Sequence, residues 1–67
     1  MKKILTARER EVFELLVKNY TTKDISDKLY ISEKTVRNHI SNVMQKLEVE
    51  TRTSAVIELI KINELSI

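Results

Sequence analysis

The sequence predicts an all-α fold of four short helices, and three features of the chain lead to that expectation. Its 67 residues include neither glycine nor proline, so no strong helix breaker interrupts the many good helix formers. Apolar residues recur at helical spacing. A serine or threonine stands at or just before the start of each expected helix, at about residues 7–18, 22–29, 33–47 and 52–62.

The length and composition indicate one small domain, residues 1–67, which buries only about 60% of its unfolded surface. The absence of cysteine excludes disulfides and thiolate metal sites and favours an intracellular, cytoplasmic protein. No apolar run approaches the ~20 residues that span a bilayer, and Met1-Lys2-Lys3 precedes no signal-peptide core. We therefore expect no membrane partner.

The first helix, 7–18, begins with a capping box in which Thr6 and Glu9 bond each other's backbone amides. Asn19 tolerates the left-handed backbone that ends many helices, so the helix should stop near Lys18 or Asn19. The residues expected to face inward are Val12, Phe13, Leu16 and Val17.

The second and third helices, 22–29 and 33–47, are joined by a three-residue turn, which gives them the proportions of a helix-turn-helix. Thr21-Thr22-Lys23-Asp24 forms another capping box. Ser26 is small enough to allow a steep crossing of the two helices. Ser32 is expected to cap the third helix.

The third helix should present a face without acidic groups. From Lys34 to Leu47 the sequence has no Asp or Glu, although charges alternate closely elsewhere. On a helical wheel, an apolar stripe lies opposite a polar face, and only the polar face offers cationic, amide and hydroxyl groups. Such groups bind phosphates and base edges in a DNA groove, so we expect base contacts from Arg37, Asn38 and Ser41, with Lys34 and Gln45 at the margins. The alternative is a solvated face that touches nothing.

Further hydroxyl and lysine side chains lie at helix starts or on the flank of that face. They are candidates for phosphate contacts in double-stranded DNA, namely Thr22, Lys23, Ser32, Thr35 and Lys46. For Thr22 and Ser32, helix capping is an equal alternative, and Lys23 could simply be solvated. The net charge of +2 is a weak argument on its own, but the positive charge is concentrated locally.

The fourth helix, 52–62, is capped by Thr51 and is more apolar than one core stripe requires. Ala55, Leu59 and Ile62 form one stripe. The surplus residues Val56, Ile57 and Ile60 predict a self-complementary surface and a two-fold homodimer. The alternatives are deep burial within the monomer or covering by Ile4, Leu65 and Ile67.

Catalysis and metal binding are not expected. His39 is the single histidine, and the sequence places neither a nucleophile nor an orienting acid beside it. We expect it to have a structural role, with a phosphate contact as the alternative. The residues of the chain therefore predict no enzyme, no cofactor and no small-molecule ligand.

Several segments together resemble the LuxR/FixJ-type helix-turn-helix domain. They are Leu5-Thr6-Ala7-Arg8-Glu9-Arg10-Glu11-Val12, Thr22-Lys23-Asp24-Ile25, Ile31 to Ile40, Lys46-Leu47 and Arg52. The resemblance covers roughly residues 4–62 and implies a four-helix LuxR-type module, a dimer and a transcription factor. Within the family the chain looks most like a single-domain regulator of sporulation. It departs from the usual glycine at Asn19 and Glu48 and the usual alanine at Ser26, and a left-handed Glu48 would be strained by ~1 kcal/mol.

The sequence also predicts one contact between helices and leaves two alternative functions open. Arg52 is expected to pair with Glu9 or Glu11 and so join the first and last helices. An alternative function is a protein-interaction module that contacts RNA polymerase. The chain could also be the effector domain of a response regulator or quorum sensor, although Met1 and the short segment before Leu5 favour a free-standing protein.

Overall fold

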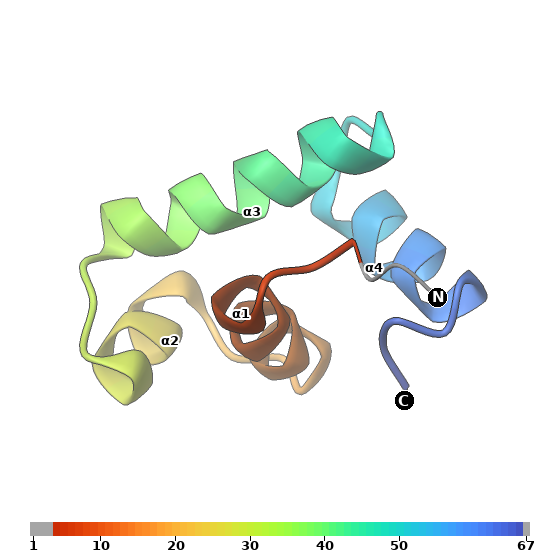
Figure 1. The fold of residues 1–67 in the computed structure, drawn as a ribbon. Helices are drawn as coiled ribbons and strands as arrows, with labels where there is room; N and C mark the ends of the chain where they lie inside the picture. The colour runs from red at the N-terminus through yellow and green to blue at the C-terminus, as the bar shows by residue number, and fades with distance from the viewer. Residues whose placement is uncertain (1–3, 67) are drawn as a thin grey trace.

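The computed structural model describes residues 4–66, and within this range the chain forms four helices. They are α1 (Ala7–Val17), α2 (Thr22–Leu29), α3 (Glu33–Leu47) and α4 (Arg52–Lys61). The all-α prediction is confirmed, and α1 and α4 each end one residue earlier than expected. α3 runs along the top of the molecule in Figure 1, with α1 and α2 beneath it and α4 beside its C-terminal end.

The four helix starts are built as the sequence predicts. The Thr6 hydroxyl accepts a hydrogen bond from the Glu9 amide at 3.1 Å, and a Glu9 carboxylate oxygen accepts one from the Thr6 amide at 2.9 Å. A second capping box joins Thr21 and Asp24. The residues that precede α3 and α4, Ser32 and Thr51, each accept from a backbone amide three residues on. Thr22 is the first residue of α2 and not its cap, so the capping alternative for Thr22 was wrong.

The helix ends use residues other than glycine in the left-handed region. Among the described residues, φ is positive at Asn19 (70°), Tyr30 (57°), Glu48 (56°) and Asn63 (63°). The prediction for Asn19 is confirmed, and Glu48 adopts the strained backbone that its position implied. Tyr30 was not expected to do so, because tyrosine carries no sequence signal for this conformation. These residues set the sharp connections that a glycine-free chain needs.

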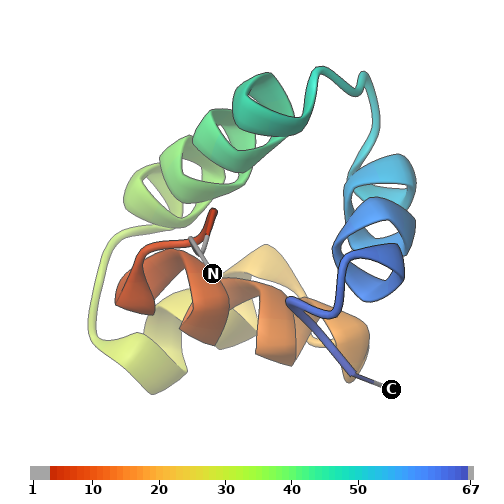
Figure 2. The same cartoon turned by 45° about the vertical axis from the view of Figure 1, so that its right-hand side comes forward.

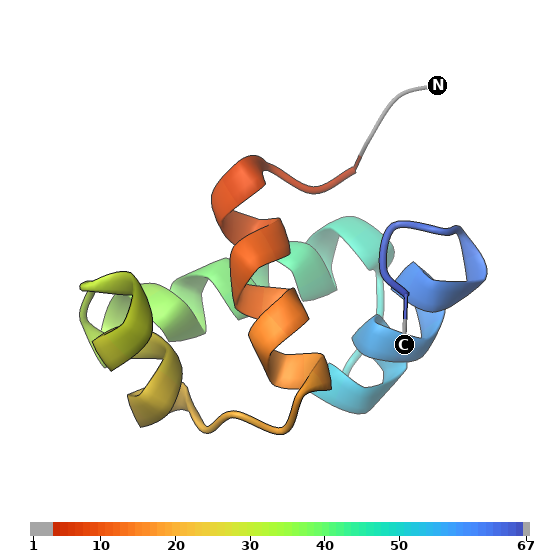
Figure 3. The same cartoon turned by 90° about the horizontal axis from the view of Figure 1, so that it is seen from below.

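The core lies where α1, α2 and α4 meet the underside of α3. Its fully buried large side chains are Phe13, Ile25, Leu59, Val12, Val36 and Val43. Ser26 is buried as expected, and its hydroxyl donates to the Lys23 carbonyl oxygen at 2.7 Å. Viewed from below, α1 crosses α3 with α2 on one side and α4 on the other (Figure 3). α3 is therefore supported along its length from one side.

Two expectations about the C-terminal region were wrong. Ile62 does not complete a core stripe with Ala55 and Leu59: it follows the end of α4 and is 42% exposed. Arg52 donates to the Thr22 hydroxyl at 3.4 Å, while Glu11 lies 3.4 Å from Arg8. Arg52 therefore connects α4 to the start of α2. The link from α1 to the C-terminal region is made by other residues, because Arg10 bonds both the carboxylate and the carbonyl oxygen of Glu64.

Candidate nucleic-acid interface

The outer side of α3 is a continuous polar surface. Val36, Ile40 and Val43 are buried against the other helices, and helical periodicity turns the intervening polar residues away from the core. The exposed residues are Lys34, Arg37, Asn38, Ser41, Asn42 and Gln45. We call this set the outer face of α3. Figures 1 and 2 show no other element of the described chain over it. The structure thus brings all four predicted base-contacting residues onto one accessible helix face.

One acidic group does reach this face. Glu33, one turn before Arg37 and just before the acid-free run, lies 3.6 Å from the Arg37 guanidinium. The two side chains are 48% and 55% exposed, respectively, so water competes with their attraction. Pairs of this kind contribute only about 0–1 kcal/mol. Arg37 can therefore exchange Glu33 for another acceptor at little cost.

The expected phosphate contacts fall into two groups at helix starts. Lys23 is exposed in the first turn of α2 and pairs loosely with Asp27 at 3.4 Å. The neighbouring Thr22 hydroxyl accepts from Arg52. At the start of α3, the Ser32 hydroxyl accepts from the Thr35 amide at 3.0 Å and lies 2.9 Å from the Thr35 hydroxyl. Capping therefore occupies one acceptor position of Ser32.

Lys46, the fifth expected phosphate contact, is bonded to other groups of the chain. Its ammonium donates to the Glu9 carboxylate at 2.6 Å and to the Ile4 carbonyl oxygen at 3.2 Å. Burial by itself would raise the pKa of Glu9, but the hydrogen bond from Lys46, together with bonds from Thr6 and the Lys46 charge, outweighs it and lowers the pKa. Glu9 is therefore ionised at neutral pH. Sequence reasoning missed this pair because its residues lie 37 positions apart.

His39 is half-buried on the flank of α3. Among residues 4–66, no group of three or more His, Cys, Asp or Glu side chains is placed to hold a metal ion. None of the helices in this range has the length and apolar character needed to cross a membrane.

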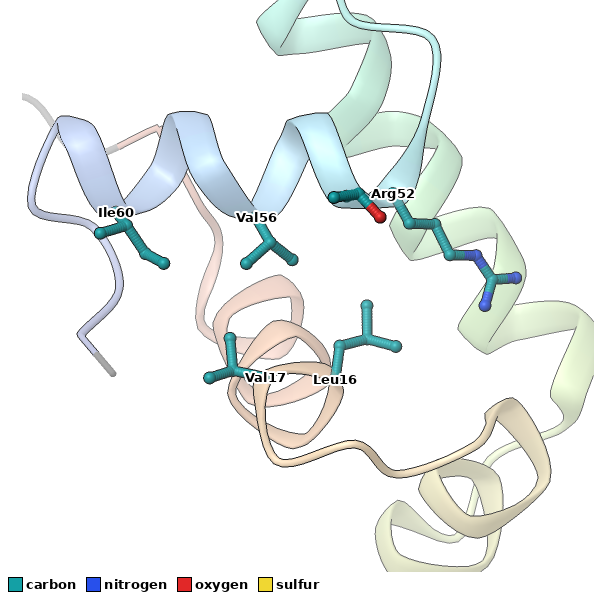
Figure 4. A pocket seen from close by; sticks show the side chains of 6 residues that line it. Leu16, Val17, Arg52, Val56 and Ile60 are labelled. Carbon is teal, nitrogen blue, oxygen red and sulfur yellow. The ribbon is translucent and has the colours of Figure 1, made fainter.

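An open apolar groove lies between α1 and α4. It is lined by Leu16, Val17, Arg52, Thr53, Val56 and Ile60 and has a volume of about 350 Å³. In Figure 4, Leu16 and Val17 of α1 point toward Val56 and Ile60 of α4, while the Arg52 guanidinium points away from them. Val56 and Ile60 are half-buried, whereas Ile57 is 49% exposed. Of the three α4 residues expected to form a dimer surface, Val56 and Ile60 line this groove and Ile57 does not. Leu16 and Val17 were expected to belong to the core.

The chain contains a helix-turn-helix whose second helix exposes cationic and amide groups. This arrangement is typical of helix-turn-helix DNA-binding proteins. The comparisons with known proteins are in agreement. The family model described as "Bacterial regulatory proteins, luxR family" matches residues 3–59. The chain belongs to the LuxR family and is a DNA-binding regulator of transcription.

The chain is similar to individual members of this family. It is 64% identical to the spore germination protein GerE of Bacillus subtilis (strain 168), over 98% of this chain and 89% of that protein. A solved structure of the transcription factor GerE superposes with a TM-score of 0.94 at 62% identity, covering 97% of both chains. The transcriptional regulatory protein DegU of Brevibacillus brevis is 55% identical over 87% of this chain, which spans only 25% of that protein.

Proposed function

We propose that this regulator binds double-stranded DNA sequence-specifically as a homodimer, with α3 of each copy in the major groove, and controls sporulation genes. The observation that carries the proposal is the outer face of α3, which is exposed along the helix and offers cationic, amide and hydroxyl groups. An α-helix fits the major groove of B-DNA, where every base pair presents a distinct pattern of donors and acceptors.

Arg37 and Asn38 are the proposed principal base-reading residues, with Ser41 beside them and Lys34 at the margin. Arginine can bond guanine O6 and N7 together, and asparagine can bond adenine N6 and N7, each giving ~1–3 kcal/mol of discrimination. The looseness of the Arg37–Glu33 pair supports this role, because Arg37 loses little when it turns to a base.

The proposed phosphate contacts are Thr22, Lys23, Ser32 and Thr35. They lie at the starts of α2 and α3, where unpaired backbone amides also favour an anion. The Ser32 hydroxyl can donate to a phosphate oxygen while its oxygen accepts from the Thr35 amide. Lys46 is left out of this set because its ammonium is bonded to Glu9.

The proposed dimer forms through α4, with Val56, Ile57 and Ile60 on each copy. Ile57 exposes an apolar side chain, and the neighbouring groove adds Leu16 and Val17 of α1 to the apolar surface. A two-fold axis through this surface would place two copies of α3 on half-sites about one DNA turn, ~10 bp, apart.

The role in sporulation rests on the similarity to the spore germination protein GerE over nearly the whole chain. A regulator that acts on the bacterial chromosome works in the cytoplasm, so we propose that location as well.

The direct test is a binding-site selection on random duplexes at two salt concentrations, followed by titration of the selected duplex. We expect a two-fold symmetric site and an affinity that falls ~10³–10⁵-fold between 50 and 200 mM salt for 6–10 phosphate contacts. Arg37→Glu with Asn38→Glu should abolish binding while the helical circular dichroism spectrum is kept. A module that only contacts RNA polymerase would bind no duplex in a salt-dependent way, and that result would refute the proposal.

A further inference from the structure

Lys46 lies at the edge of the outer face of α3, in a position from which a free ammonium could reach DNA. At ~100° per residue, Lys46 and Thr35 are only about 20° apart around the helix axis, and they are separated by about 16 Å along it. Thr35 is a proposed phosphate contact. Lys46 therefore continues the same edge toward the C-terminal end of α3, and the Lys46 side chain is 37% exposed.

The ammonium of Lys46 is nevertheless held by two acceptors of the chain itself. Glu9 has a side chain that is only 5% exposed, and the oxygen that accepts from Lys46 at 2.6 Å also accepts from the Thr6 amide at 2.9 Å. The second acceptor, the Ile4 carbonyl oxygen, belongs to a residue whose amide donates to Glu64 at 2.7 Å. Neither acceptor can follow Lys46 outward without breaking other bonds.

The two ion pairs made by Arg37 and Lys46 of α3 therefore differ in how easily DNA could replace the carboxylate. The Arg37–Glu33 pair is exposed on both sides and 3.6 Å apart, so a phosphate or base can take the place of the carboxylate. Releasing Lys46 would leave the buried Glu9 carboxylate without its cation, with only the Thr6 amide as donor, which costs far more. Lys46 is close to the DNA-binding surface, but its charge is already neutralised.

We propose that Glu9 is a positioning residue for DNA binding: it holds Lys46 out of the phosphate-binding set and so limits the part of the affinity that does not depend on DNA sequence. Sequence-independent affinity comes from released counterions, and each neutralised phosphate adds about 0.9 to the slope of log K against log salt. One lysine withheld in each chain lowers non-specific binding without touching a base-reading residue. The inference rests on the proposed binding of DNA by the outer face of α3.

The test compares Glu9→Gln with the parent chain on a mixed-sequence duplex that lacks the selected site. Glutamine keeps the shape of the side chain and an acceptor for the Thr6 amide but no longer neutralises Lys46. We expect tighter non-specific binding at low salt and a salt slope steeper by about 0.9 for each bound chain, or about 3.5-fold between 50 and 200 mM salt. The affinity for the selected duplex should rise by a similar factor, because a phosphate contact acts on all sequences alike.

The double variant Glu9→Gln with Lys46→Gln is the matched control, since it removes both charges and leaves no unpaired buried ion. We expect its salt slope to equal that of the parent chain. A slope about 0.9 lower in the double variant would mean that Lys46 binds phosphate in the parent, and the inference would be overturned. The double variant decides the question even where Glu9→Gln alone fails to fold.

The inference would also be overturned if the salt slope of Glu9→Gln were equal to that of the parent chain. Glu33→Gln is a second control, because it removes the exposed acid of the other pair and should leave the position of Lys46 unchanged. If the parent chain itself shows no salt-dependent binding to any duplex, the proposed function fails. If the parent chain binds DNA but the variants do not show the expected salt slopes, only the proposed role of Glu9 fails.

Discussion

The outer face of α3 and the groove between α1 and α4 are both open to solvent, but they suit different partners. The face of α3 carries cationic, amide and hydroxyl groups that stand free of the core. Beside α4 lies the apolar groove, in which Val56 and Ile60 of α4 face Leu16 and Val17 of α1. The polar face can be predicted from the sequence of one helix. The apolar groove cannot, because it forms only where two helices pack together. In the proposed function, DNA and a second copy of the chain therefore use separate surfaces.

The largest effect on dimerisation and DNA affinity is expected from Val56→Glu with Ile60→Glu, a variant that tests whether the two surfaces have separate partners. Two carboxylates in the groove cannot be desolvated against a second copy, so the variant should sediment as a monomer. Loss of the linked second half-site should lower affinity for a two-half-site duplex by roughly 10²–10⁴. The control is Ile62→Glu, because Ile62 is a 42% exposed isoleucine outside the groove. Sedimentation of the groove variant as the same species as the parent would contradict the proposed dimer.

The next effect concerns the outer face of α3. Arg37→Ala should lower affinity for the selected duplex by about 5- to 150-fold and relax the preference at one base position, corresponding to ~1–3 kcal/mol. Lys23→Ala is the comparison, since a phosphate contact should weaken all sequences alike and lower the salt slope by about 1. Competition titrations with single-base variants of the site distinguish the two. Equal losses on every sequence would remove Arg37 from the base-reading set.

An acid titration tests the pair of Glu9 and Lys46 at the edge of the outer face of α3. The pKa of Glu9 is lowered in the folded chain, so its ionisation stabilises the fold above a glutamate's ordinary pKa of 4.5. That stability is lost as the pH falls through the lowered pKa. We expect the melting temperature to drop below pH 4.5 in the parent chain and to drop less in Glu9→Gln. An identical acid dependence in both would show that the Glu9–Lys46 pair does not stabilise the fold.

Much of this fold was predictable from local sequence signals. Thr6, Thr21, Ser32 and Thr51 mark the helix starts because a cap bonds amides only two or three residues away. The apolar period then oriented α3 correctly. The partner of Lys46 was not predictable, because Glu9 lies 37 residues away and only tertiary packing brings it near. Arg52 was assigned the wrong partner for the same reason.

The outer face of α3 was predictable because its residues all lie on one helix, where spacing alone determines the shared face. The groove was only half predictable, since the apolar positions of α1 cannot be divided into core and surface without knowing where α4 packs. Leu16 and Val17 are therefore a packing result and not a sequence signal.

The smallest effect is expected at Glu48, which belongs to neither surface. Its backbone ends α3 in the left-handed region at φ 56°, which costs a residue with a Cβ atom roughly 1 kcal/mol more than glycine. Glu48→Gly should therefore stabilise the fold and raise the melting temperature by about 4–8 °C per kcal/mol, less the greater freedom of glycine in the unfolded chain. Because the side chain is exposed and the faces of α3 and α4 are unchanged, DNA affinity and the sedimentation coefficient should stay as in the parent. Asn19→Gly is the matched comparison, and the gain there should be smaller, since asparagine tolerates φ 70° better than glutamate tolerates its own value. A gain in stability that also altered DNA binding would mean that the end of α3 takes part in recognition, and the division between the two surfaces would have to be redrawn.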